Sequence, residues 1–208
     1  MPQALIISTD SPAAIPTAIN VLNQGGLIAF PTDTVYGLAS RLDSSAAIEK
    51  LFLAKGRDFN KAIAVLIGDL EHITSVSLYF PDSAVRLASI FWPGALTMVV
   101  IRQPSLPINL SPDNTIGVRM PDHSFARQLL RASGPLATTS ANLSGMPNPL
   151  SAQDVFAQLG DRIDLILDGD SVPGGVPSTV VGCTTDEIRI FRQGVISEEE
   201  IRETLSHS

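Results

Sequence analysis

Lys50, Lys55 and Lys61 are the only lysines of the chain, and Arg57 lies among them. Three lysines scattered at random would gather in so short a segment on the order of one time in a hundred, which exceeds ordinary charge patterning. Cationic side chains concentrated in this way can bind phosphate or carboxylate groups. The alternative interpretation is the solvated end of a helix.

Small polar residues follow several apolar stretches of strand length. They occur in PTDTVYGLAS (31–40), KGRDFNK (55–61), TTSANLSG (138–145) and VPSTVV (176–181). Such loops offer hydroxyl and amide groups with little bulk, so a backbone can approach a ligand closely. Together with Arg119 and Arg192 they could line one cleft for an anionic ligand. The alternatives are that Asp and Thr serve only turn chemistry, and that Arg119 pairs with a core carboxylate such as Asp122.

Several other kinds of site are disfavoured. The chain has no GxxxxGK[ST] loop, no GxGxxG that opens a helix after a strand, and no GxSxG serine motif. His72, His123 and His207 are far apart, so we expect surface or capping histidines rather than a metal centre. Cys183 is the only cysteine, which excludes an intrachain disulfide, and we expect it to be a small buried hydrophobic residue.

Composition places the chain among ordinary globular proteins. Hydrophobic residues make up 44% and charged residues 17%, which excludes collagen, coiled coil and disorder. The 14 basic and 21 acidic residues give a net charge of −7, so bulk charge does not suggest a nucleic-acid binder. No apolar run approaches the ~18 to 20 residues that span a bilayer, and the N-terminus does not resemble a signal peptide. We expect a cytoplasmic protein without membrane contact.

Strand-like and helix-like segments alternate over most of the chain, which is typical of an α/β domain with a twisted open sheet. A length of 208 residues favours one domain over 1–208. Ser11 before Pro12 and Ser44 or Ser45 are predicted to cap helices, the second of which ends near Gly56. The polar loops would then follow the ends of strands, where open α/β sheets bind ligands.

Seven motifs resemble those of the YrdC-like family, the threonylcarbamoyl-adenylate synthases, in order and spacing. They are PTDTVYGLAS, KGRDFNKAIAVLI, FWPGALTMVV, TIGVRMPDH, TSANLSG, PSTVV and FRQG, and the resemblance covers roughly residues 12 to 195. It implies an α/β fold with an open mixed sheet, flanking helices and a deep ligand groove. It also implies synthesis of L-threonylcarbamoyl-AMP and pyrophosphate from L-threonine, bicarbonate or CO2, and ATP with Mg2+. The product would supply the downstream tRNA threonylcarbamoyl transferase machinery.

The resemblance assigns roles residue by residue, with no side-chain nucleophile and with positioning by Lys55 and Arg57. The residues implied to contact L-threonine are Thr34, Arg119, Ser140 and Ser178. The residues implied to contact ATP are Lys55, Arg57, Lys61, Thr115, Asn142 and Arg192. The chain departs from the family pattern at Asp58 and Ala62, where prolines are usual, at Leu150 in place of a threonine, and at Gly182 in place of an aspartate.

Three alternatives stay open at this point. The first is an RNA-binding accessory protein that uses the same groove for RNA, against which the net charge argues. The second is the carbamoyl-transfer module of hydrogenase maturation, which normally accompanies acylphosphatase and zinc-finger domains that we do not find in this sequence. The third is a paralogue that has kept the fold and lost the activity.

Overall fold

The computed structural model describes residues 3–206. In this range the helices are α1 (Ala14–Asn23), α2 (Ser45–Lys55), α3 (Ile73–Val76), α4 (Asp82–Phe91), α5 (Ser124–Ser133), α6 (Ala152–Leu159) and α7 (Glu198–Ser206). The strands are β1 (Leu5–Ser8), β2 (Ile28–Phe30), β3 (Gly37–Arg41), β4 (Ala64–Leu66), β5 (Ser77–Tyr79), β6 (Leu96–Arg102), β7 (Thr115–Arg119), β8 (Leu136–Ser140), β9 (Leu165–Asp168), β10 (Thr179–Gly182) and β11 (Arg189–Arg192).

Helix α2, which precedes the lysine-rich loop (residues 55–61), is capped at both ends as the sequence predicts. Ser44 Oγ accepts a hydrogen bond from the Ala47 amide at 3.2 Å, and Gly56 ends α2 with a φ of 58° that favours glycine. The predicted cap at Ser11 is wrong, because α1 begins only at Ala14. Ser11 Oγ instead accepts from the Ala13 amide inside the preceding turn, at 3.3 Å.

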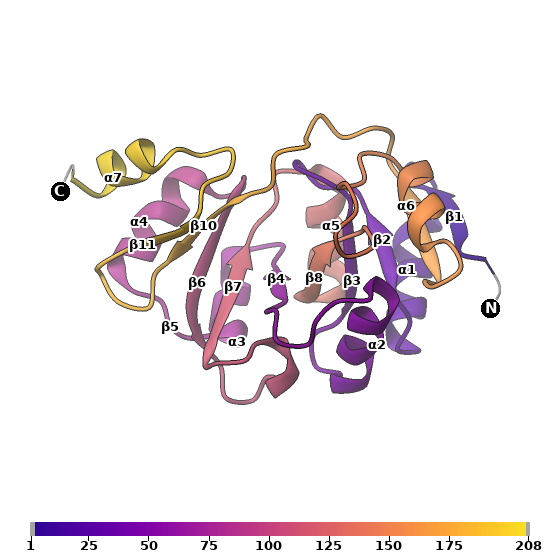
Figure 1. Ribbon diagram of the computed structural model, residues 1–208, viewed down its shortest axis with the longest axis horizontal. Coiled ribbons are helices and arrows are strands. Elements are labelled where there is room, and N and C mark those ends of the chain that lie inside the picture. Colours follow the sequence, from indigo (N-terminus) through magenta and orange to yellow (C-terminus); the bar gives the residue numbers. More distant parts are fainter. Residues whose placement is uncertain (1–2, 207–208) are drawn as a thin grey trace.

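The strands form one open mixed sheet, as expected (Figure 1). The order is β1-β9-β2-β3-β8-β4-β7-β6-β10-β11, and β5 pairs with β6. The β1–β9, β2–β9, β4–β7 and β6–β10 pairs are parallel, and the remaining pairs are antiparallel. The sheet therefore joins segments that lie more than a hundred residues apart in the chain.

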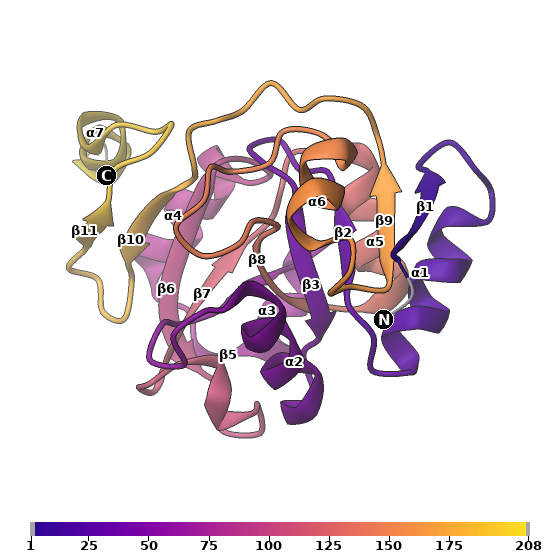
Figure 2. The same cartoon turned by 45° about the vertical axis from the view of Figure 1, so that its right-hand side comes forward.

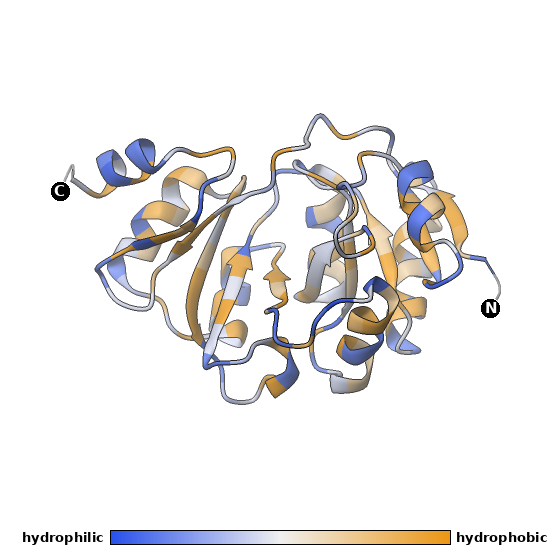
Figure 3. Ribbon diagram, in the orientation of Figure 1, coloured by the Kyte–Doolittle hydropathy of each residue, from blue (hydrophilic) through white to orange (hydrophobic). Residues whose placement is uncertain are grey.

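Alternate residues of the strands point to two different cores, because a strand has a period of two. In β9, Leu165 and Leu167 pack with α1 and α5, whereas Ile166 packs in the larger core on the other face with α2, α4 and α6. Figure 3 shows apolar residues along many of the strands, with α7 and the segment after α2 mostly hydrophilic.

Helices α1 and α5 cover only one end of their face of the sheet. Strand pairing places four residues side by side across the sheet: Thr138, Ala64, Gly117 and Val99. They lie on the same face of the sheet as α1 and α5, beyond the part that these helices cover. The residues there are small, and Gly117 has no room for a side chain, because a Cβ would lie 3.1 Å from Thr97 Cγ2. This uncovered part of the face forms the floor of the candidate site.

A long connection crosses the molecule from β9 to β10, which lie far apart in the strand order. We call residues 169–178 the strap. Figures 1 and 2 both show it passing over one end of the sheet. It brings Pro177 and Ser178 to the uncovered face.

Candidate active site

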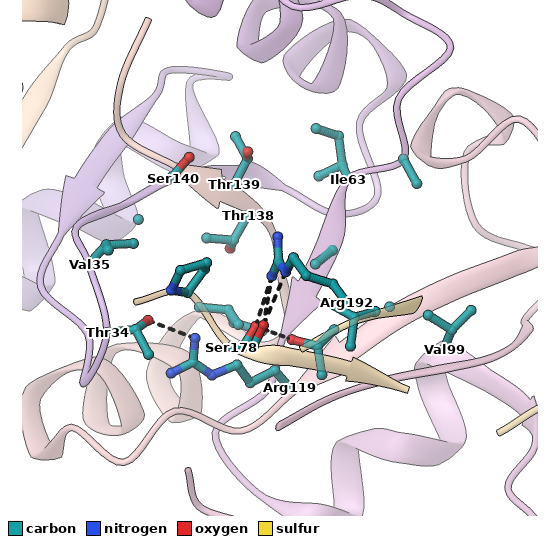
Figure 4. A pocket seen from close by; sticks show the side chains of 18 of the residues that line it. Thr34, Val35, Ile63, Val99, Arg119, Thr138, Thr139, Ser140, Ser178 and Arg192 are labelled. Atoms are coloured by element: carbon teal, nitrogen blue, oxygen red, sulfur yellow. Dashed lines mark hydrogen bonds between the residues drawn. The ribbon is translucent and has the colours of Figure 1, made fainter. Parts of the chain in front are cut away.

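A cavity of about 380 Å³ lies on the uncovered face, within the range of about 300 to 1,000 Å³ typical of small-molecule sites. Its walls come from the loop between β2 and β3, the segment before β4, strands β6, β7 and β8, the end of the strap, and β11. Figure 4 shows side chains from these segments converging on one space. The four polar loops and two arginines of the sequence analysis thus meet at one site.

The loop after β2 is held by a threonine side chain. Pro31 follows β2 and has no amide hydrogen to continue a strand ladder. Thr32 Oγ1 then donates to the Val35 carbonyl at 2.6 Å and accepts from the amides of Thr34 and Val35. Thr32 and Thr34 are both buried, so the loop is a rigid wall of the cavity.

Arg119 is buried at the end of β7 and is fixed by three groups. Its Nε donates to the Gly94 carbonyl at 2.9 Å, Nη1 to Thr34 Oγ1 at 2.9 Å, and Nη2 to Asp33 Oδ1 at 2.5 Å. The predicted alternative partner Asp122 is therefore wrong, and the partner is Asp33. Two of the five N–H donors of the guanidinium stay available to a ligand.

Arg192 lies at the end of β11, across the cavity from Thr34 (Figure 4). Its Nη2 donates to the Ser178 carbonyl at 2.9 Å, and Ser178 Oγ bonds with Thr97 Oγ1 at 2.8 Å. Burial, and then the nearby charge of Arg119, lower the pKa of Arg192, but an arginine stays charged at neutral pH. The arginine pair makes this wall positive and suited to anions.

The lysine-rich loop is ordered although prolines are absent from it. Asp58 Oδ1 accepts from the Asn60 amide at 2.9 Å, and the ring of Phe59 stacks on Phe52 with centroids 4.9 Å apart. Arg57 lines the cavity and donates from Nη2 to the Ala62 carbonyl at 2.8 Å. Ring stacking and a turn hydrogen bond thus hold this loop.

Lys55 is not among the residues that line the cavity. Its side chain is buried, with 2% exposed, and Nζ donates to the carbonyls of Ser140 and Asn142 at 2.5 Å each and to Asn142 Oδ1 at 3.2 Å. Burial, and then the charge of Arg57, lower the pKa of Lys55 to about 7. Lys55 therefore braces the turn after β8.

The predicted site residues fall into two groups. Those that line the cavity are Thr34, Arg57, Thr115, Arg119, Ser140, Ser178 and Arg192. Lys55, Lys61 and Asn142 do not line it: Asn142 is buried in the turn and Lys61 is exposed to solvent. Direct contacts of these three residues with ATP stay predictions.

Asp33 and Thr97 are two site residues to which the sequence analysis gave no role. Asp33 orients Arg119, and Thr97 orients Ser178 across the β6–β10 pair. The position of Asp33 between two threonines could have indicated that Asp33 belongs to the site. Nothing in the sequence around Thr97, which lies in an apolar strand, indicates a role in the site. Only the register of two strands that are distant in the chain brings Thr97 beside Ser178.

His72, His123 and Cys183 have structural roles. His123 Nδ1 accepts from the Ala126 amide at the start of α5, and burial lowers the pKa of His123. His72 Nδ1 accepts from the Gly68 amide, while His207 lies outside the described residues. Cys183 is fully buried, as expected, which raises its thiol pKa to about 12. Within residues 3–206 no group of three His, Cys, Asp or Glu side chains could hold a metal ion.

Tyr36 joins the loop after β2 to the strap. Its hydroxyl donates to the Asp170 carbonyl at 2.8 Å and accepts from the Gly169 amide at 3.2 Å. Burial raises the pKa of Tyr36 to about 12, so the hydroxyl keeps its proton. Farther along the strap, a Cβ on Gly174 would lie 1.3 Å from the Thr34 carbonyl oxygen. The strap is thus pressed against the same loop that carries Thr34.

Fold and site together define an α/β protein with a positive cleft for small anionic ligands. The sequence model of the Sua5/YciO/YrdC family, described as telomere recombination, matches residues 20–194. The chain belongs to the Sua5/YciO/YrdC family. Among the described residues no helix is both long and apolar enough to cross a membrane.

Several known proteins are similar over most of the chain. The threonylcarbamoyl-AMP synthase of Bacillus subtilis is 40% identical over 201 residues, which cover 94% of this chain and 57% of that protein. A relative from Mycobacterium tuberculosis is 40% identical over 92% of this chain and 88% of its own length. The chain thus spans little more than half of the Bacillus protein.

Solved structures agree with this fold. The Sua5 protein of Pyrococcus abyssi in complex with L-threonine superposes with a TM-score of 0.90 at 33% identity, over 98% of this chain and 60% of that one. Escherichia coli YciO superposes with a TM-score of 0.84 at 28% identity, over 97% of this chain and 100% of that one.

Proposed function

We propose that this protein synthesises L-threonylcarbamoyl-AMP and pyrophosphate from L-threonine, bicarbonate or CO2, and ATP. The observation that carries the proposal is a buried arginine, Arg119, held rigidly with two free donors in a cavity that two further arginines also line. The names of the relatives and the L-threonine complex of the Pyrococcus protein support the same activity.

The end of the cavity near Arg119 suits an amino acid. A carboxylate can take both remaining N–H donors of the guanidinium, and Thr34 and Ser178 lie beside it as further polar contacts. Because Asp33 and Gly94 already hold the guanidinium, little entropy is lost in orienting the guanidinium when a substrate binds there.

The other walls suit a triphosphate. Arg57 and Arg192 supply positive charge, and Thr115 supplies a hydroxyl, whereas no carboxylate of the described residues lines the cavity. Lys61 follows Arg57 in the same loop, so its positive charge can add long-range attraction for the triphosphate. Mg2+ would enter with ATP as part of the substrate, since a metal held by phosphate oxygens needs few protein ligands. It would offset the charge of the triphosphate and of the departing pyrophosphate.

The reaction requires no protein nucleophile. The amine of threonine adds to CO2 and loses a proton to form a carbamate, and a carbamate oxygen then attacks the α-phosphorus of ATP. The new P–O bond forms as the bond to pyrophosphate breaks, and the electron pair leaves with pyrophosphate. The side chains of this cavity position two anions and offset their charge, which is how phosphoryl transfer is generally accelerated.

The product is an activated acyl-adenylate that a transferase must consume, and we propose the tRNA threonylcarbamoyl transferase machinery as that consumer. A direct contact with RNA is less favoured, because the chain carries a net charge of −7. Binding of RNA that falls steeply with salt, in a protein that releases no pyrophosphate, would favour the RNA-binding alternative instead.

The test is product analysis with purified protein, ATP, Mg2+, bicarbonate and each amino acid in turn. We expect pyrophosphate and threonylcarbamoyl-AMP only when L-threonine and bicarbonate are both present. Equal release of pyrophosphate without bicarbonate would contradict the carbamate as nucleophile. Omitting Mg2+ should abolish release.

A further inference from the structure

The loop after β2 and the strap are attached to each other at two separate points. We propose that Tyr36 is a positioning residue for the amino-acid end of the cavity: it holds the strap against the loop and so fixes Thr34, on the loop, relative to Ser178, at the end of the strap. The inference rests on the proposed function, and it concerns how the site is held rather than which groups contact the substrate.

The first point of attachment is the hydroxyl of Tyr36. The side chain of Tyr36 is fully buried, and its hydroxyl donates to the Asp170 carbonyl at 2.8 Å and accepts from the Gly169 amide at 3.2 Å. Asp170 has a φ of 63°, in the left-handed region that residues with a side chain rarely adopt. The bond from Tyr36 and a bond from the Asp170 amide to Asp168 Oδ1, at 3.3 Å, hold this conformation. The direction in which the strap leaves β9 therefore depends on Tyr36.

The second point of attachment is the main chain of Thr34, two residues earlier in the same loop. The Gly175 amide donates to the Thr34 carbonyl at 3.3 Å, and a Cβ on Gly174 would lie 1.3 Å from the same oxygen. No side chain separates the two main chains here, so a shift of the strap displaces Thr34 directly. Between the two points, the Val172 amide donates to the Leu150 carbonyl at 2.9 Å, and the Val172 side chain is buried. Loop and strap thus form one closed unit.

Both segments of this unit reach the proposed amino-acid site. Thr34 Oγ1 accepts from Arg119 Nη1 at 2.9 Å, and Ser178, at the end of the strap, lines the same cavity (Figure 4). The end of the strap is also confined from its other side, because a Cβ on Gly194 would lie 2.1 Å from the Pro177 carbonyl oxygen. A strap that is released at its start therefore shifts the groups that we assign to the amino acid.

The ATP contacts that we propose come from other segments. Arg57 is held by the Ala62 carbonyl and Thr115 by Asp113 Oδ1, each within its own part of the chain. Arg192 contacts the end of the strap, but β11, on which it lies, is paired with β10. Loosening the strap should therefore weaken binding of the amino acid more than binding of ATP.

The first experiment compares Tyr36→Phe with Tyr79→Phe, in which the hydroxyl is removed from a tyrosine that is 51% exposed. Calorimetric titration of the folded Tyr36→Phe protein should show a loss of L-threonine affinity of at least about fivefold, with ATP affinity within about twofold of the parent. Tyr79→Phe should match the parent for both ligands. A purely structural role would lower the melting temperature and change both affinities equally or not at all, and either result would overturn the inference.

Hydrogen exchange gives a second readout, which needs no ligand. The Gly175 amide lies five residues beyond Asp170, so it exchanges faster in Tyr36→Phe only if the attachment at the start of the strap also holds its middle. L-threonine added to the parent should slow exchange of the same amide. An unchanged exchange rate at Gly175 in Tyr36→Phe would overturn the inference whatever the affinities.

The third experiment acts on the strap itself and does not depend on Tyr36→Phe being folded. Gly174→Ala must displace either the strap or Thr34, so L-threonine affinity should fall at least about tenfold and ATP affinity by less than about twofold. Gly26→Ala is the matched control, because its Cβ would also be crowded, with Val21 Cγ1 at 2.7 Å, but outside the cavity lining. We expect Gly26→Ala to lower the melting temperature and to keep both affinities.

The outcomes separate this inference from the proposed function. If the parent binds L-threonine and Gly174→Ala binds it equally well, the inference fails alone. If the parent itself binds no L-threonine, the proposed function fails and the inference fails with it.

Discussion

Arg119, which is buried, and Asp33, which is partly buried, form an ion pair in which Nη2 lies 2.5 Å from Oδ1. The two residues are 86 positions apart in the chain and meet at the wall of the cavity. Thr34 and Gly94 hold the other nitrogens of the same guanidinium. A buried charge held on three sides keeps one orientation, so its two free donors are already oriented for the carboxylate that we propose as their ligand.

We expect Arg119→Lys to weaken L-threonine binding at least tenfold and ATP binding by less than about twofold. A lysine keeps the charge but cannot meet Asp33, Thr34 and a ligand carboxylate together, because it lacks the planar fork of donors. Separate titrations of the two ligands and a melting curve would test this. A lower melting temperature with equal losses for both ligands would show that Arg119 only supports the fold.

Arg57→Ala should lower ATP affinity at least tenfold, since charge-assisted hydrogen bonds contribute about 1.5 to 3 kcal/mol each. Arg57 lines the cavity, and its Nε is buried without a hydrogen-bond partner among the described residues. Lys61→Ala should have a smaller effect, because Lys61 is exposed outside the cavity lining. If ATP titrations give both variants the affinity of the parent, the alternative interpretation is right and the cationic segment is only the solvated end of a helix.

Tyr36→Phe should lower the free energy of unfolding by about 1 to 3 kcal/mol, because it leaves the Gly169 amide and the Asp170 carbonyl without their partner. Urea denaturation measures the loss, and hydrogen exchange at the Gly169 amide should become faster. Tyr79→Phe is the matched control, since Tyr79 is 51% exposed and its substitution should change stability by less than about 0.5 kcal/mol. Equal stability of the two variants would refute the anchoring role of Tyr36.

Stability should rise with pH above neutrality in a way that depends on Lys55. Burial lowers the pKa of Lys55 to about 7 in the folded protein, against about 10.4 in an unfolded chain. Between these values the unfolded chain holds more protons, so the free energy of unfolding increases with pH, by at most about 5 kcal/mol over the whole window.

Denaturation of the parent and of Lys55→Met at a series of pH values would measure this effect. From pH 7 to pH 10 the free energy of unfolding of the parent should increase relative to that of Lys55→Met. Contributions from other titrating groups are common to both proteins and cancel in this difference. A difference that stays constant with pH would contradict the low pKa of Lys55.

Local patterns were sufficient to predict many elements. The cap at Ser44 and the end of α2 at Gly56 depend only on neighbouring residues, so they could be predicted. Strand β3 was harder to predict, because GLASR is short and has no strong alternation. It becomes a strand because β2 and β8 pair with its two edges, and this pairing involves residues far away in the chain.

The sequence by itself determined which chemical groups the site has. Hydroxyl-rich loops, a single cationic segment and the arginines of β7 and β11 are properties of residue type and order, and they indicated the family and its substrates. Only the tertiary structure decided where each group points. Lys55 turns inward to Asn142, Arg119 pairs with Asp33 instead of Asp122, and Thr97 supports Ser178. These directions follow from strand register and burial, which are set by contacts between segments about 80 or more residues apart, beyond the range of any local pattern.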